Sequence, residues 1–184
     1  MVQTPIKLLT LEEFLKLPET KPASEYIDGL ILQKPMPQGE HSILQTDLPP
    51  TINLVLKPYA RAFTELRCTF GGRSTIPDIA VFVSERIPRK ENGGIDNVFS
   101  IAPDWTIEIL SPDQRQTKVT KNILHCLKYG TQMGWLIDPD ERSVLVYLPD
   151  QPTMLYDEPN LSLPVPVFAT NFSFTLEGLF DPCT

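Results

Sequence analysis

The spacing of apolar and polar residues changes along the chain in a way that predicts both helices and strands. The predicted order is a helix, a hairpin, a broken helix, three strands, a helix, two strands and a tail. The corresponding ranges are 10–17, 25–35, 39–59, 62–70, 74–83, 103–112, 117–129, 134–139, 143–149 and 151–184. This order predicts an α/β (α+β) sandwich around a mixed β-sheet flanked by helices.

Local signals mark the ends and breaks of the first elements. Thr10, with Glu13 three residues later, forms a capping-box pattern that opens the first helix. The dipeptide 28–29, Asp-Gly, is a hairpin turn signal between two short β segments. The two prolines at 49–50 should break or kink the helix around them, because proline lacks the backbone donor that a helix interior needs.

The segment 117–129 has helical periodicity with two distinct faces. Its apolar face contains Val119, Ile123, Cys126 and Leu127, and its polar face contains Lys118, Lys121, Asn122, His125 and Lys128. In the proline-rich tail, "VPVFA" is strand-like and "TLEGLF" predicts a short helix. Trp105 and Trp135 flank strands, so we expect them in the core rather than as platforms for base stacking.

Composition adds limits on domain number and class. The 184 residues are 41% hydrophobic and 21% charged, which is ordinary for one globular domain. We predict a single domain, 1–184, with an N-terminal helix and hairpin at 9–35, a core at 39–148 and a tail at 149–184. The net charge of −7 argues against a nonspecific nucleic-acid coat. Only the middle, 57–128, is net positive, with 11 bases and 8 acids, so a polyanion would meet the protein there, unless this excess is an accident of a solvated surface.

Cysteine usage and the N-terminus bear on the compartment. Cys68, Cys126 and Cys183 are widely spaced and form no CxxC motif, which favours buried free thiols in a reducing environment. The first 20 residues contain no secretion signal, and the apolar runs are too short for a membrane span. We therefore expect a cytoplasmic protein that does not enter the membrane.

Two predicted strands each contain one carboxylate among apolar neighbours: Asp78 in "STIPDIAVFV" and Glu108 in "PDWTIEILSP". A buried charge costs several kcal/mol unless it is paired or binds a cation. Side chains from adjacent strands can converge on one divalent cation, and the backbone carbonyl of Ile109 is a further hard oxygen ligand. The pair therefore predicts a Mg²⁺ or Mn²⁺ site, which could activate water against a phosphodiester.

Several stretches together resemble a known family. In order along the chain, they are "EYIDGLIL", "GEHS", "PDIAVF", "PDWTIEILSP" and "GWLIDP". Residues 9–148 resemble the Uma-type family of restriction endonucleases, within the PD-(D/E)xK nuclease superfamily. The resemblance implies a restriction-endonuclease-like fold, a Mg²⁺-dependent phosphodiesterase centre at Asp78 and Glu108, and a DNA substrate. A homodimer is also expected, because cutting both strands with one site per chain usually needs two chains.

The lysine of the superfamily signature is missing, since Leu110 stands where E-x-K has lysine. The resemblance implies a lysine from the next helix, which leaves Lys118 and Lys121 as candidates. The family's usual Asp and Lys align with Lys118 and Asn122, so Lys118, on the same face as Asn122, is favoured over Lys121. Lys128 lies too far along the helix.

Four further residues are accessory candidates for this site. They are Glu25, His41, Gln116 and Asn122, of which Glu25 and His41 could add a third ligand or shape the site. Bland alternatives stay open, because the lysines could be solvated on a polar helix face and Glu25 could lie on the hairpin surface. Leu110 and Asn122 also leave open a second function, a catalytically inactive nuclease-fold protein that binds nucleic acid or a protein partner. A plain structural module is a third, but it leaves the two carboxylates unexplained.

Overall fold

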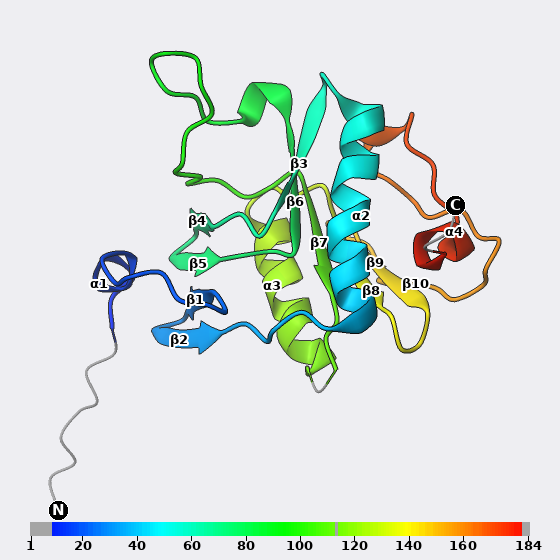
Figure 1. Ribbon diagram of the computed structural model, residues 1–184, viewed down its shortest axis with the longest axis horizontal. Coiled ribbons are helices and arrows are strands. Elements are labelled where there is room, and N and C mark those ends of the chain that lie inside the picture. Colours follow the sequence, from blue (N-terminus) through cyan, green and yellow to red (C-terminus); the bar gives the residue numbers. More distant parts are fainter. Residues whose placement is uncertain (1–8, 113, 182–184) are drawn as a thin grey trace, which may run out of the picture.

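The computed structural model describes residues 9–112 and 114–181, which form a mixed α+β domain with two sheets. The larger sheet has six strands in the order β10-β9-β8-β7-β6-β3 (Figure 1). Their bounds are β3 Ala60–Thr64, β6 Ile79–Val83, β7 Trp105–Ile109, β8 Met133–Asp138, β9 Ser143–Tyr147 and β10 Met154–Tyr156. Among the paired strands of this sheet, β7 and β8 are parallel, and the helix between them in the chain makes the crossover connection. The other pairs are antiparallel, so the sheet is mixed, as predicted.

The smaller sheet contains the N-terminal hairpin. Its order is β2-β1-β5-β4, with β1 Ser24–Ile27, β2 Leu30–Gln33, β4 Cys68–Phe70 and β5 Arg73–Thr75. The hairpin turns at Asp28 (φ 52°) and Gly29 (φ 86°), as the turn signal predicts. Before it lies α1 (Leu11–Leu15), with both reciprocal bonds of the predicted capping box between Thr10 and Glu13.

Helix α2 (Gly39–Leu56) covers one face of the larger sheet, and α3 (Gln116–Lys128) lies on the other (Figure 1). The α2 side contains the largest apolar core, to which α2 contributes Leu44, Leu48, Ile52 and Leu56. The C-terminal segment, with the 3-10 helix η2 (Val167–Ala169) and α4 (Leu176–Phe180), packs on the same core. Strand residues alternate between the faces, so Ile79 and Ile107 point toward α2 while their neighbours point toward α3.

A side-chain amide joins α2 to an edge of the larger sheet. Asn53 accepts a hydrogen bond from Ala62 N at 2.9 Å and donates one to Ala62 O at 3.0 Å. Because β3 is an edge strand, Asn53 bonds the outward-facing backbone groups at its centre. The predicted break at the two prolines is wrong, because α2 runs through Pro49 and Pro50 as one helix. Packing of its buried face on the sheet compensates for the lost backbone bonds.

The predicted polar face of α3 is wrong at two positions, since Asn122 and His125 are both buried. The smaller sheet covers this side of the helix. His125 stacks on Phe70 with ring centroids 5.0 Å apart, and its Nε2 donates to Phe70 O at 3.2 Å. The predicted apolar face is confirmed, with Val119, Ile123 and Cys126 buried. Helical periodicity alone could not show that two different sheets contact α3.

Three other predictions about elements need correction. The range 62–70 is not one strand, because Glu65 (φ 48°) turns the chain and β3 and β4 join different sheets. The "VPVFA" segment forms the 3-10 helix η2 rather than a strand, and β10 lies where only a tail was predicted. The "TLEGLF" helix is confirmed as α4, which Thr175 caps.

The cysteine and tryptophan predictions can be compared directly. Cys68 and Cys126 are buried free thiols, and burial, with the nearby Glu108 carboxyl, raises the pKa of Cys68 to about 12. Cys183 lies outside the described residues. Trp105 and Trp135 are fully buried, as predicted, and pack edge to face at 4.7 Å. Within 9–112 and 114–181, no helix is both long and apolar enough to cross a membrane.

Candidate active site

The pairing of β6 with β7 brings the two predicted carboxylates together. Ile79 pairs with Ile107 in an antiparallel register, and one further step sets Asp78 opposite Glu108. Opposed residues in such a pair have Cβ atoms about 4.5–5.5 Å apart. Both side chains are buried, with 2% of Asp78 and 5% of Glu108 exposed. They lie on the face of the larger sheet that α3 and the smaller sheet cover.

Asp78 has three neighbours from three parts of the chain. Its Oδ2 accepts a hydrogen bond from Ile109 N at 2.8 Å, so the backbone of the residue whose carbonyl was predicted as a ligand lies beside it. Its Oδ1 forms an ion pair with Lys34 Nζ at 2.6 Å. His41 Nε2 lies 3.4 Å from Oδ2, and His41 Nδ1 is 3.0 Å from the Ser111 hydroxyl. Asp78 is therefore a meeting point of α2, the hairpin and β7.

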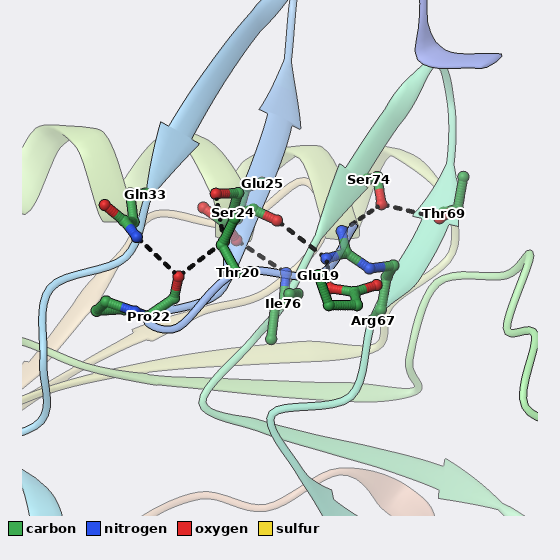
Figure 2. Close-up of polar contacts among 10 residues, drawn as sticks. All are labelled: Glu19, Thr20, Pro22, Ser24, Glu25, Gln33, Arg67, Thr69, Ser74 and Ile76. Atoms are coloured by element: carbon green, nitrogen blue, oxygen red, sulfur yellow. Dashed lines mark hydrogen bonds and ion pairs between the residues drawn. The ribbon is translucent and has the colours of Figure 1, made fainter. Parts of the chain in front are cut away.

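A third carboxylate, Glu25, approaches from β1 of the smaller sheet. Its Oε1 accepts a hydrogen bond from Ile76 N at 2.8 Å (Figure 2). Glu25 is 6% exposed, so the alternative of a surface position on the hairpin is wrong. Burial raises its pKa, and the bond from Ile76 N opposes this rise.

Arg67 fixes the strand that carries Glu25. Its guanidinium donates to Ser24 O at 3.1 Å, to Ser74 Oγ at 3.1 Å and to Glu19 at 2.7 Å (Figure 2). These bonds link β1, β5 and the segment after α1, directly beside Glu25. The contacts of Arg67 with Ser24, the residue before Glu25, and with Ser74 therefore hold the strand that carries this carboxylate.

The electrostatics of the site reflect crowded negative charge. Burial raises the pKa of Glu108 well above its usual value, and repulsion from Asp78 adds to the rise. Burial works against the charged form of Lys34, but attraction to Asp78 and Glu108 outweighs it and raises the pKa of Lys34. Burial lowers the pKa of His41, which favours the neutral imidazole at pH 7. Within 9–112 and 114–181, the buried ammonium of Lys34 thus serves three buried carboxyl groups.

A small pocket of about 20 Å³ lies where the hairpin, β7 and α3 meet. Its lining residues come from all three elements and from their connections: Glu25, Gln33, Lys34, Pro35, Glu108, Gln114, Lys118, Val119 and Asn122. Lys118 is exposed at this pocket, whereas Lys121 and Gln116 are exposed outside its lining. The structure therefore brings Lys118 and Asn122 to the carboxylates, but not Lys121 or Gln116.

The surroundings of Leu110, at the E-x-K lysine position, are apolar. Leu110 lies two residues after Glu108 and packs against the apolar cluster of Val119, Ile123 and Leu136 under α3. No ammonium group can come from this position.

Lys34 is the residue that sequence reasoning missed. A signal for it was present, because the two-residue turn at 28–29 pairs Glu25 with Leu32. Lys34 follows two residues later and so shares the face of Glu25. The missed contacts involve Asp78, 44 residues away, and they depend on how the hairpin lies across the larger sheet.

The donor set fits a divalent cation in its chemistry. Carboxylate oxygens of Asp78 and Glu108 are hard ligands of the kind that Mg²⁺ prefers, and the excess of buried carboxyls over cations favours one more positive charge. Within the described parts of the chain, no group of three or more His, Cys, Asp or Glu side chains has the geometry to hold a metal. The fit thus rests on the two acids, with Glu25 nearby.

The chain is similar to known proteins in sequence and in fold. A family model with the description "Putative restriction endonuclease", Uma2, matches residues 11–177, and the chain belongs to this family. Its fold is similar to a crystal structure titled as a putative nuclease belonging to DUF820 from Anabaena variabilis ATCC 29413. The two share 67% sequence identity with a TM-score of 0.92, over 94% of this chain and 97% of that one. No curated protein matches. The family and this neighbour support a nuclease, and the predicted resemblance and fold class are confirmed.

Proposed function

We propose that the protein is a Mg²⁺-dependent endonuclease that hydrolyses DNA phosphodiester bonds at a PD-(D/E)xK-type centre. The observation that carries the proposal is the convergence of two buried carboxylates, Asp78 just before β6 and Glu108 in β7, whose charge Lys34 only partly neutralises. Glu108 and Lys34 also line the small pocket beside them. A fold gains nothing from crowding these carboxyls unless a cation joins them.

In this proposal, Asp78 and Glu108 hold Mg²⁺ or Mn²⁺, and the carbonyl of Ile109 is a third oxygen donor. The bound cation would supply Lewis-acid stabilisation of charge on the phosphate. Ile109 N already fixes one oxygen of Asp78, which leaves the carboxylate little freedom to rotate. Lys118, on the wall of the pocket, is suited to a phosphate contact, and Glu25 and His41 shape the site. Asn122 would have a smaller role on the wall of the pocket, and Gln116 and Lys121, which do not line it, could act only from the surrounding surface.

The surface around the pocket supports DNA as the substrate. Exposed basic residues at the start of α3 include Arg115, Lys118 and Lys121, next to the pocket on the only net-positive segment of the sequence. A homodimer, in which each chain cuts one strand, and a cytoplasmic location complete the proposal.

A second candidate function is a nuclease fold that binds nucleic acid or a protein without cleaving it. The packing of Leu110 in an apolar cluster favours this alternative, because it removes the lysine position of the signature. The two candidates differ in one measurable property, which is metal-dependent cleavage.

The test is nicking of supercoiled plasmid by the purified protein. We expect nicked and linear products with Mg²⁺ or Mn²⁺, no products with EDTA, and no products from the Asp78→Ala variant. Absence of cleavage by the wild type across both metals, in protein that still binds the plasmid, would favour the noncatalytic candidate.

A further inference from the structure

Lys34 is held rigidly at the end of the hairpin, with its ammonium group among the acids. Its backbone N–H bonds to Ala23 O at 2.9 Å, and Pro35 follows directly. Its side chain is 12% exposed. Its Nζ donates to Asp78 Oδ1 at 2.6 Å and to Ile76 O at 2.7 Å. A lysine ammonium is thus fixed directly beside the carboxylate pair.

The contacts of Lys34 leave part of its hydrogen-bonding capacity unused. An ammonium has three donors, and within 9–112 and 114–181 two of them have partners. Lys34 also lines the pocket together with Glu108. A lysine needed only to neutralise Asp78 would not have to face the pocket. The remaining donor is available to an anionic group that enters it.

The other lysines near the pocket are placed differently. Lys118 is exposed on its wall, and no hydrogen bond or ion pair of its side chain occurs within the described residues. Lys121 is exposed and does not line the pocket. Held by Asp78 and the Ile76 carbonyl, Lys34 needs less ordering to act on a bound phosphate than an exposed surface lysine does.

We propose that Lys34 is the catalytic lysine of this centre and contacts the scissile phosphate in place of the missing E-x-K lysine. This inference rests on the proposed function. In the hydrolysis, the oxygen of water bonds to phosphorus while the bond from phosphorus to one ester oxygen breaks. The water releases a proton to the solvent, and the leaving oxygen takes one up. Lys34 keeps its proton and stabilises the charge that develops on the phosphate.

The pocket offers a site for a transplanted lysine, which allows a rescue experiment. Asn122 lines the same pocket, hydrogen-bonds Glu25 and has a buried Oδ1 that lacks a partner among the described residues. An ammonium at position 122 would therefore meet the same acids from α3. The variants are Lys34→Met, the double variant Lys34→Met/Asn122→Lys, and the matched controls Lys118→Met and Lys121→Met.

Two readouts separate this inference from the proposed function. The first is plasmid nicking with Mn²⁺, where Lys34→Met should be slower by roughly 100-fold or more, the double variant should regain much of the loss, and Lys121→Met should lose far less than Lys34→Met. The second is fluorescence anisotropy of a short DNA duplex in Ca²⁺. Lys34→Met should weaken the Ca²⁺-dependent part of this binding about 10-fold, as expected for loss of a charged phosphate contact. Replacing a residue that only supports the fold would not selectively weaken the Ca²⁺-dependent part of DNA binding.

The outcomes distinguish the two claims. Folded Lys34→Met that nicks and binds like the wild type overturns the role of Lys34, as does a larger effect from Lys118→Met. If the wild type does not nick, the proposed function fails, and the duplex binding alone then supports or overturns Lys34 as a phosphate contact. If Lys34→Met does not fold, the double variant decides, because it restores the ammonium. A folded double variant without nicking or Ca²⁺-dependent binding counts against the proposal.

Discussion

Two regions of the protein bury carboxylates, and they differ in how the charge is balanced. Directly before the start of β7, Asp104 is 2% exposed and has its own partners. It accepts a hydrogen bond from Val83 N at 2.9 Å and forms an ion pair with Arg86 Nη1 at 2.5 Å. One cation and one backbone donor match one carboxylate, so Asp104 is explained by the fold alone.

The pocket near the other end of the same strand is unbalanced. In and beside it, Glu25, Asp78 and Glu108 share one buried ammonium among the described residues, that of Lys34, and the pKa values of Glu25 and Glu108 are both raised. A buried acid with a complete set of partners indicates a structural role. Buried acids that repel one another indicate that something from outside the chain belongs with them. This contrast supports a cation site in the pocket and none at Asp104.

The largest expected difference between the two regions is in cleavage. Asp78→Asn should reduce metal-dependent plasmid nicking by roughly 1,000-fold, because it removes a charge that would hold the proposed cation. Asp104→Asn should leave nicking within a few-fold of the wild type, measured well below its melting temperature. Equal losses from both variants would mean that the pocket has no special role.

Stability should show the opposite pattern. Asp104→Asn should lower the free energy of unfolding by about 1.5–3 kcal/mol, because Arg86 then loses its charged acceptor. Urea denaturation of the metal-free protein measures this. An unchanged midpoint would contradict the structural role of Asp104.

Removing charge from the pocket should stabilise the metal-free protein. The folded state raises the pKa of Glu108 above its ordinary value of 4.5, so the contribution of Glu108 to stability is present below pH 4.5. It is lost as the pH rises through the folded-state pKa. Glu108→Gln should therefore raise the melting temperature at pH 8 by about 3–6 °C, or roughly 1–2 kcal/mol for a chain of this size. The gain should shrink toward pH 4, and a gain that is the same at both pH values would argue against this cause.

Metal should have a smaller effect, and only on the intact pocket. With a dissociation constant of about 1 mM, about 10 mM Mn²⁺ adds about 1.4 kcal/mol and raises the melting temperature by roughly 3–5 °C. Asp104→Asn should keep this shift, while Glu108→Gln should lose it. A wild type that does not respond would indicate a carboxylate pair that binds no cation.

The sequence predicted the parts of this picture that depend on neighbouring residues. Alternation and capping signals located β6, β7, α3 and the hairpin, and they identified Asp78 and Glu108 as carboxylates within strands. The split of 62–70 between two sheets was not predictable, because alternation gives no information on which strand is the partner. The burial of His125 was missed because helical periodicity likewise gives no information on which sheet packs against each face of α3. Lys34 acts across 44 residues through the placement of one sheet on another, which no local pattern encodes.

The Asn53 amide has a consequence for how copies of this protein can assemble. Sheets extend when an exposed edge strand pairs with another chain. Asn53 occupies both backbone groups of Ala62 at the centre of β3, so this edge is closed to a second chain. The opposite edge, β10, is only three residues long. Two copies that paired through β10 would use up that edge in both chains, so growth of the larger sheet by strand pairing would stop at a closed pair rather than continue into a fibre.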